Sequence, residues 1–196
     1  MNANRCIIVS CAVFAAVLFS ACKPSVSGGH NTSIPCSSMK EPAGMKCIPG
    51  GEFIRGSNRT TVDEDSGRKV KDEFPESKVY VSTFFMDTNE VTFSQYQECV
   101  RAGGCKPARP NYRGYSNPNQ PMLGVNWFHA RDFCTWVGKR LPTETEWEKA
   151  ARGDAGDSFP WGNEPADCTR AIIQEKAKKG CGTGITYDVA SRPAYR

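Results

Sequence analysis

The sequence predicts an α+β fold with little regular secondary structure. Three observations predict it: a short segment of alternating apolar residues, several apolar repeats of helical period that follow capping signals, and long stretches rich in proline, glycine and asparagine between them. Charged residues make up 23% of the chain and hydrophobic residues 39%, which is typical of a globular protein rather than a disordered one. We therefore expect one domain, preceded by a leader and a tether.

Residues 1–21 are predicted to be a lipoprotein signal peptide. Arg5 gives a weakly positive start, and the run "CIIVSCAVFAAVLFS" from Cys6 has the length of a secretory core and is short for a membrane span. The stretch "LFSAC" resembles a bacterial lipobox, which favours cleavage before Cys22 and a lipid anchor on its thiol. The alternative is an uncleaved anchor helix. Both interpretations place the protein in the bacterial cell envelope, exported and held at a membrane.

Residues 22–44 are predicted to be the lipid anchor and a flexible tether, and residues 45–196 the domain. The stretch "KPSVSGGHNTSIPCSSM" is rich in serine, glycine and proline, and a coil of that length spans on the order of 20–25 Å. Within the domain, the polar stretch 58–77 is predicted to be a surface loop. Its Asp63, Glu64 and Asp65 make calcium possible, but the ligand spacing of a calcium loop is missing, so a solvated charge run is the favoured interpretation.

The cysteines are expected to form disulfides, because an exported protein meets an oxidising compartment. Seven remain when Cys22 and the leader are set aside, and none forms a C-x-x-C pair. With only two histidines in the chain, a zinc site is not expected. Proximity favours three local pairs, while other pairings stay open, and one cysteine is left as a predicted unpaired thiol. The pairs are Cys36–Cys47, Cys99–Cys105 and Cys168–Cys181, and the remaining cysteine is Cys134.

The middle of the chain predicts one strand and two helices. Apolar and polar residues alternate from Lys78 to Phe85, which predicts a strand. Thr92 and Gln95 form a capping-box signal for a helix that ends at Gly103. A second helix is predicted from about Trp127 to Val137, capped by Asn126, with Trp127, Ala130, Phe133, Cys134 and Val137 on a buried stripe. His129 falls off that stripe and is predicted to be a surface residue.

The stretch "GKRLPTETEWEKAARGDAGDSFPWGNE" raises the question of an acid–base site. Thr143 and Glu146 form a further capping box, so a helix is predicted over about Glu144 to Arg152, with Glu148 paired to Arg152. Glu144 and Glu148 share a face and could act as an acid–base pair. Acidic residues in the first turns of a helix also stabilise it through the helix dipole. The favoured interpretation is that this stretch is scaffolding, with Trp147 and Ala151 in the core.

Five ordered blocks resemble the formylglycine-generating enzyme (sulfatase-modifying factor) family: "IPGGEFIRGS", "FFMDTNEVTFSQYQECV", "PMLGVNW", "FCTWVGKRLPTETEWEKAARG" and "FPWGNE". The resemblance covers about residues 45–196 and implies that family's α+β fold, which is related to C-type lectins and poor in regular structure. It also implies the family's activity, the oxidation of a sulfatase cysteine to formylglycine with oxygen and with copper bound by two cysteines.

The resemblance implies that this domain is incomplete at its C-terminal end. The final stretch "TYDVASRPAYR" resembles the segment before a family block that holds the sequence "GL-x-D-M-x-G-N-V-x-E-W", and the copper cysteines lie beyond that block. No catalytic, cofactor-binding or metal-binding residue is therefore assigned. The resemblance further implies a distal C-terminal partner for Cys134; the other interpretation is a small buried hydrophobe.

Two functions of different classes remain. In the first, the chain is a lipid-anchored, non-catalytic module that binds a protein or polypeptide ligand or serves envelope structure. In the second, it is the N-terminal part of a copper-dependent formylglycine-generating oxidase. Nucleic-acid binding is not expected, because the formal charge of +4 is mild and no Lys/Arg-rich run is present.

Overall fold

The computed structural model of the protein describes residues 7–8, 33–58, 60–62, 67–70, 73–108, 114–175 and 178–193. The predicted anchor residue Cys22 and the rest of the leader apart from Ile7–Ile8 lie outside these ranges. Among the described residues, no helix is long and apolar enough to cross a bilayer.

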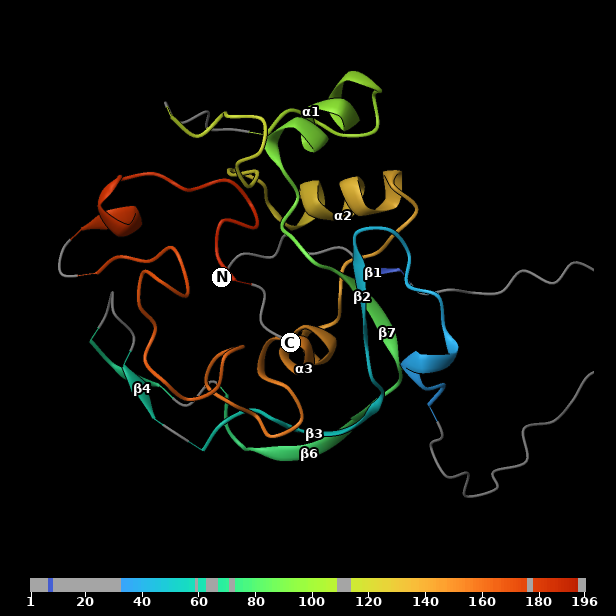
Figure 1. Ribbon diagram of the computed structural model, residues 1–196, viewed down its shortest axis with the longest axis vertical. Coiled ribbons are helices and arrows are strands. Elements are labelled where there is room, and N and C mark those ends of the chain that lie inside the picture. The colour runs from blue at the N-terminus through green and yellow to red at the C-terminus, as the bar shows by residue number, and fades with distance from the viewer. Residues whose placement is uncertain are drawn as a thin grey trace, which may run out of the picture.

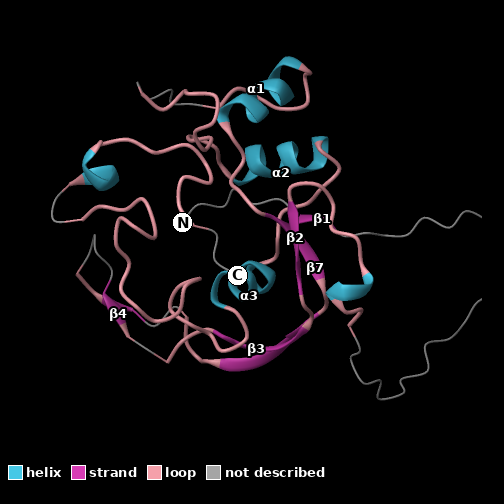
Figure 2. Ribbon diagram, in the orientation of Figure 1, coloured by secondary structure: helices cyan, strands magenta, loops and turns pink. Residues whose placement is uncertain are grey.

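Short strands and short helices alternate with long loops (Figures 1 and 2). The strands are β1 (Ile7–Ile8), β2 (Met45–Ile48), β3 (Gly51–Arg55), β4 (Thr61–Val62), β5 (Lys69–Val70), β6 (Ser77–Val81) and β7 (Phe84–Asp87). The helices are α1 (Phe93–Arg101), α2 (Trp127–Trp136) and α3 (Glu144–Arg152), with 3-10 turns η1 (Cys36–Ser38) and η2 (Lys179–Gly182). All strand pairs are antiparallel: β7 lies between β1 and β2, β3 pairs with β6, and β4 pairs with β5. The predicted α+β class with little regular structure is confirmed.

The three predicted helices begin where their capping residues stand. The side chains of Thr92, Asn126 and Thr143 each accept a hydrogen bond from the backbone N–H three residues on. Each cap is also reciprocal, because the side chain at that third position accepts from the N–H of the capping residue. These local interactions are encoded by residues close in sequence, which is why the helix starts were predictable.

The predicted strand over 78–85 is divided between two sheets. β6 pairs with β3, whereas β7 pairs with β2, and Ser82–Thr83 join them. Thr83 explains the change of direction. Its hydroxyl donates to the carbonyl of Ile34 and accepts from the N–H of Gly50, at 2.5 and 3.0 Å, and its own N–H donates to Ser33.

The segment 33–44, which was assigned to the tether, is attached to the sheet. Ser33 Oγ lies 2.7 Å from the hydroxyl of Tyr80, and the disulfide Cys36–Cys47 joins η1 to β2. Glu41 accepts from the backbone N–H of Cys47 at 3.1 Å and pairs with Lys46. The ordered domain therefore includes residues from Ser33 onward.

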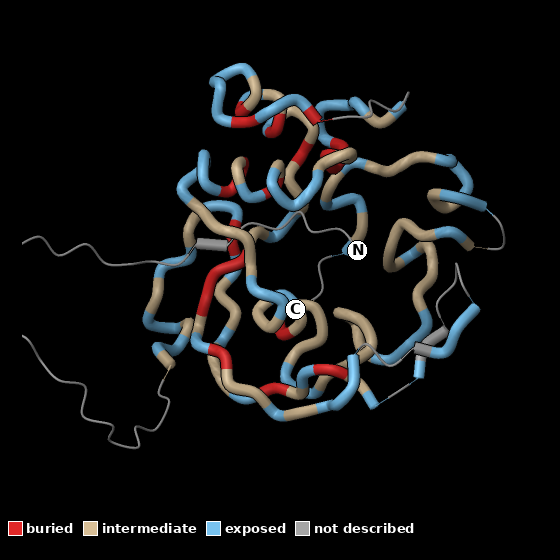
Figure 3. The backbone as a smooth tube through the Cα atoms, turned by 180° about the vertical axis from the view of Figure 1, so that it is seen from behind, coloured by how far each residue is buried: buried red, intermediate tan, exposed pale blue. Residues whose placement is uncertain are grey.

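Two hydrophobic clusters hold the domain together (Figure 3). The first joins α1 to α2 and contains Tyr96, Cys99, Cys105, Ala108, Met122, Phe133 and Cys134. The second lies between β3, β6, β7 and α3 and contains Phe53, Val81, Phe84 and Met86. None of the described residues from Gly153 onward is fully buried, so the C-terminal loops lie around this core rather than in it.

Candidate functional site

The first candidate site, the carboxylates of α3, is occupied by structural contacts. Glu146 accepts from the Arg140 guanidinium at 2.6 and 2.8 Å and from the N–H of Thr143 at 2.8 Å. Burial alone would raise the pKa of Glu146, but the hydrogen bonds from Arg140 and Thr143 outweigh it and lower that pKa. The same hydrogen bond raises the pKa of Arg140. This carboxylate therefore stays ionised and serves the helix start.

Glu148 is fixed in a second network, together with Arg152. Its Oε1 accepts from the N–H of Gly56 at 2.7 Å and from Arg152 at 2.5 Å, which confirms the predicted ion pair. Arg152 also donates to the carbonyls of Gly56, Gly156 and Asp157 at 2.7 to 2.9 Å. The network joins α3 to the end of β3 and to the following turn. The interpretation of this stretch as scaffolding agrees with these contacts.

A buried lysine on α3 was not anticipated. Lys149 is 3% exposed, contacts Asp154 and lies with its ammonium 5.4 Å from the Phe53 ring centre. Trp147, which was expected in the core, is 41% exposed instead. The signal for Lys149 is present in the sequence only as its spacing of five residues from Asp154, which is too common to be diagnostic.

The three predicted disulfides are confirmed. Cys36–Cys47, Cys99–Cys105 and Cys168–Cys181 have Cα–Cα distances of 5.7, 5.2 and 5.6 Å. Cys99 and Cys105 are both buried, and their bond fastens the end of α1 to the loop that follows.

The prediction of an unpaired thiol at Cys134 is wrong. Cys134 is fully buried on α2 and is disulfide-bonded. The other six described cysteines pair among themselves, so the partner of Cys134 lies outside the described residues. Nearness in sequence could not reveal a pairing of this kind.

No metal centre forms in the described part of the chain, where no group of three His, Cys, Asp or Glu side chains converges. His129 accepts at Nδ1 from the N–H of Asn126, 3.4 Å away, and so completes the cap of α2. The possible calcium ligands Asp63, Glu64 and Asp65, and His30, lie outside the described residues.

The outer face of α2 exposes aromatic side chains. Trp127 and Phe128 are 56% and 60% exposed, and the Arg131 guanidinium lies 5.5 and 5.4 Å from their ring centres. Trp136, at the other end, lies above a shallow surface hollow lined also by Gly104, Arg131, Asp132 and Thr135. The buried stripe of α2 is therefore Ala130, Phe133 and Cys134, and the expectation that Trp127 and Val137 belong to it is wrong.

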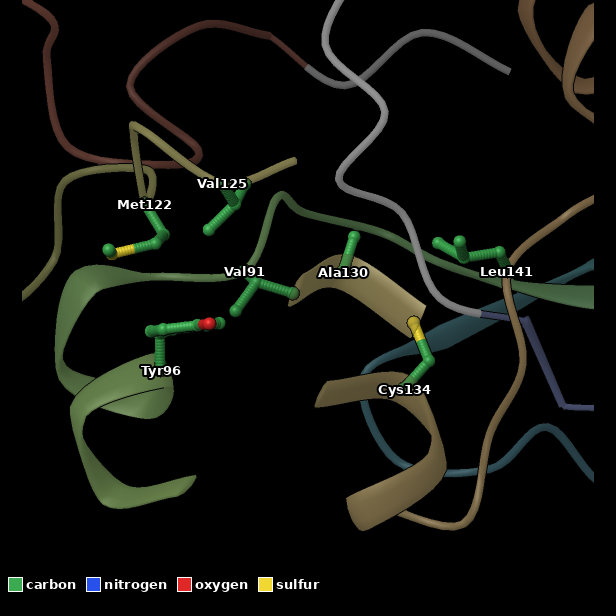
Figure 4. A pocket seen from close by; sticks show the side chains of 7 residues that line it. All are labelled: Val91, Tyr96, Met122, Val125, Ala130, Cys134 and Leu141. Carbon is green, nitrogen blue, oxygen red and sulfur yellow. The ribbon is translucent and has the colours of Figure 1, made fainter. Parts of the chain in front are cut away.

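A small apolar pocket lies between α1, α2 and the segment after β7 (Figure 4). Its lining side chains are Val91, Tyr96, Met122, Val125, Ala130, Cys134 and Leu141. The free space of about 10 Å³ holds no more than one water molecule, which excludes a cofactor-sized ligand in this form of the protein.

The sequence was compared with protein-family models and with known proteins, and both comparisons find relatives. The family model described as the sulfatase-modifying factor enzyme 1-like domain matches residues 32–190. An uncharacterized protein of Bacillus subtilis, YfmG, is 34% identical over 63% of this chain and 28% of its own length. The formylglycine-generating enzyme of Bos taurus is 27% identical over 67% of this chain and 46% of its own length.

A third relative has a different activity in its name. A serine/threonine-protein kinase of Chlamydia pneumoniae is 36% identical over 76% of this chain and 24% of its own length. The chain thus spans about half or less of the length of these relatives. Since the family model covers most of the chain, this protein belongs to the sulfatase-modifying factor enzyme 1-like family.

Proposed function

We propose that this chain is an exported, lipid-anchored protein that uses its sulfatase-modifying-factor-like domain for binding or envelope structure and not for oxidase chemistry. The observation that supports this most directly is the state of the cysteines. Six of the seven in the described part of the chain pair with one another, so none of these six offers a thiolate to a metal or a substrate, and the seventh, Cys134, is fully buried.

The described residues do not fit the copper that the family resemblance implies. A soft metal of this kind selects thiolate ligands, and six of the seven described cysteines are already paired with one another in disulfides. The carboxylates of α3 do not replace these thiolates as copper ligands. Glu146 and Glu148 each accept hydrogen bonds from side chains and backbone N–H groups of the domain itself. We therefore derive no oxidase step from these residues.

The partners proposed are a membrane, through lipid on Cys22, and a protein or polypeptide ligand. The exposed aromatic side chains on the outer face of α2 support a binding role, because Trp, Phe and Arg side chains are enriched at protein interfaces. A C-type-lectin-like arrangement of loops around a small core is part of the same proposal.

The second candidate function is that of an N-terminal part of a formylglycine-generating oxidase. The similarity to a bovine protein of that name favours it, since this chain matches 46% of that protein's length. In that case the copper-binding cysteines of the oxidase would lie outside residues 1–196.

The test is the intact mass of the native protein extracted from its source membrane, followed by an oxidation assay on a cysteine-containing sulfatase peptide. We expect a mass equal to Cys22–Arg196 plus lipid and no formylglycine product. A heavier polypeptide that forms formylglycine would establish the oxidase instead. A chain without lipid would remove the anchor from the proposal.

A further inference from the structure

Three large aromatic side chains are exposed on the outer side of α2. Trp127, Phe128 and Trp136 are 56%, 60% and 41% exposed, although the helix has only ten residues. Exposed clusters of large apolar side chains mark surfaces to which another molecule binds. The outer face of α2 is therefore an interaction surface, and its polar residues indicate what kind of partner it fits.

The exposed residues of α2 are arranged symmetrically about one line along the helix. An α-helix turns by about 100° per residue, so Phe128 and Thr135, seven positions apart, lie almost on one line parallel to the helix axis. Arg131 and Asp132 lie halfway between them, at nearly the same height and on opposite sides of that line. The two exposed tryptophans lie further from the line, one on each side and at opposite ends of the helix.

Arg131 and Asp132 carry opposite charges whose hydrogen-bonding capacity is only partly used. Nε and Nη2 of Arg131 both donate to the same carboxylate oxygen, Oδ1 of Asp132, at 2.9 and 2.6 Å. Within the described part of the chain, Nη1 of Arg131 and Oδ2 of Asp132 have no hydrogen-bond partner. The two side chains are 49% and 33% exposed, so both are accessible to a second molecule.

These charges favour a protein partner over an anionic membrane. The two charges cancel, whereas helices that bind anionic lipid carry an excess of Lys and Arg on their polar face. A partner that fits this face presents an acceptor opposite Arg131 and a donor opposite Asp132. A second copy of this chain presents both. A two-fold axis parallel to α2 brings Arg131 of each copy opposite Asp132 of the other, because these residues lie on opposite sides of the central line.

We propose that this protein forms a symmetric dimer in which the α2 helices of two copies lie side by side and parallel. Phe128 and Thr135 of one copy meet the same residues of the second copy along the axis, and Arg131 and Asp132 form ion pairs between the copies. The tryptophans cover the rim. Contacts with two-fold symmetry are the commonest in homo-oligomers.

The proposed contact is small and predicts a weak dimer. One face of a ten-residue helix lies at the lower end of the range of interface sizes, so we expect a Kd on the order of 10 µM. This inference rests on the binding role proposed for the α2 face and names a second copy of the chain as the polypeptide that is bound. It leaves the pairing of β1 with β7 and all disulfides unchanged, and it does not depend on the lipid anchor.

The experiment is sedimentation velocity on the full chain in a mild non-ionic detergent, at concentrations about tenfold below and above the expected Kd. Arg131→Asp and Asp132→Arg each place like charges opposite one another across the axis, so each should weaken dimerisation about tenfold or more. An equimolar mixture of these two variants should dimerise again, because opposite charges then face each other. Trp127→Ser should also weaken the dimer, whereas Trp147→Ser, which removes an exposed tryptophan of α3, is the matched control and should have no effect.

The other outcomes overturn the inference in recognisable ways. Monomers at every concentration would mean that no second copy covers the face. If such monomers bind vesicles of phosphatidylglycerol and phosphatidylethanolamine through Trp127, the occupant is a lipid surface instead. A dimer that persists in both charge variants, or a mixture that stays monomeric, would exclude the proposed ion pairs. An equal loss with Trp147→Ser would indicate non-specific apolar association. The intact mass and the formylglycine assay are measured independently, so failure of the dimer is distinguishable from failure of the proposed anchor or of the non-catalytic role.

Discussion

Gly56 is the residue at which the end of β3 meets α3. Its N–H donates to Glu148 and its carbonyl accepts from Arg152, while its φ of +79° lies in the left-handed region. A Cβ atom at this position would lie 2.4 Å from the carbonyl oxygen of Glu73, which is backbone and cannot move aside easily. The position therefore requires glycine for both conformation and space.

We predict that Gly56→Ala lowers the free energy of unfolding by about 2 kcal/mol or more, because strain and a backbone clash add. Gly138→Ala is the matched control: its φ is +72°, yet nothing lies within 4 Å of the added Cβ, so only about 1 kcal/mol is expected. Urea unfolding measures both. Equal losses for the two variants would show that the clash at Gly56 is relieved.

Glu146 gives a prediction about pH. Its pKa is lowered from the ordinary value of 4.5, because the hydrogen bonds from Arg140 and Thr143 outweigh burial. Since the folded pKa lies below the unfolded one, the carboxylate stabilises the fold above about pH 4.5, and this contribution is lost as the pH falls through the folded pKa. Glu146→Gln should lower stability by about 1 kcal/mol at neutral pH and by less in acid.

The matched control is Glu144→Gln, an exposed acid in the first turn of the same helix. Thermal unfolding followed between neutral pH and a pH well below 4.5 compares the two variants with the parent. A difference between parent and Glu146→Gln that stays constant over this range would contradict the pKa argument.

At the scale of elements, α1 is held at both ends by different means. Its first turn is fixed by the capping box of Thr92 and Gln95, and its last turn by the buried disulfide Cys99–Cys105. Gly104 allows the tight return, since a Cβ there would lie 2.4 Å from the Trp136 ring. The helix contributes Tyr96, whose hydroxyl donates to the carbonyl of Lys106 inside this loop.

We predict that Cys99→Ala with Cys105→Ala lowers the free energy of unfolding by about 2–3 kcal/mol, the value expected for a short closed loop. Hydrogen exchange should speed up in the last turn of α1. The pair Cys36→Ala with Cys47→Ala should leave α1 exchange unchanged, because that disulfide joins η1 to β2. Unchanged exchange in α1 for the first variant would show that the loop holds without its disulfide.

At the scale of the whole molecule, Gln120 joins the C-terminal loops to the helical core. It is 1% exposed, donates through Nε2 to the carbonyl of Thr186 at 2.8 Å and accepts at Oε1 from the N–H of Asn117 at 3.1 Å. Its own carbonyl accepts from the N–H of Phe93 at the start of α1. Gln120 therefore links its own loop to the start of α1 through its backbone and to the C-terminal loops through its side chain.

Gln120→Ala should loosen the C-terminal loops, because the N–H of Asn117 and the carbonyl of Thr186 lose their part-buried hydrogen bonds to this side chain, which should cost about 1–3 kcal/mol in all. We expect faster hydrogen exchange over residues 184–189 and little change in α2. Gln120→Glu keeps the acceptor for Asn117 but turns a second acceptor toward Thr186, so it should loosen the same loop. Uniform loss of protection across the domain would argue that the C-terminal loops unfold together with the core.

The features that could be predicted from the sequence are those determined by contacts between residues close together in the chain. Helix starts follow from capping residues such as Thr92 and Thr143, and the disulfides follow from cysteines less than fifteen positions apart. The scaffolding role of α3 follows from the spacing of Glu148 and Arg152. In each case the partners lie within one loop or one helix, so their contact hardly depends on the rest of the fold.

The parts that could not be predicted depend on distant contacts. The exposure of Trp127 depends on which face of α2 meets α1, and apolar periodicity alone does not distinguish a buried face from an aromatic surface. The order of residues 33–44 depends on Thr83 and Tyr80, some fifty positions away. The pairing of β1 with β7 depends on a strand about eighty residues further along the chain.

The attachment of residues 33–47 gives the domain a defined mechanical coupling to its proposed anchor. Tension on a lipid at Cys22 would enter the domain at Ser33, where side-chain hydrogen bonds to Tyr80 and Thr83 yield first. Beyond them the Cys36–Cys47 disulfide carries the force covalently into β2. Because β2 pairs antiparallel with β7 over four residues, the pull would shear several hydrogen bonds at once instead of unzipping them singly. If the proposed anchor is present, we expect a domain coupled in this way to keep its core under tension.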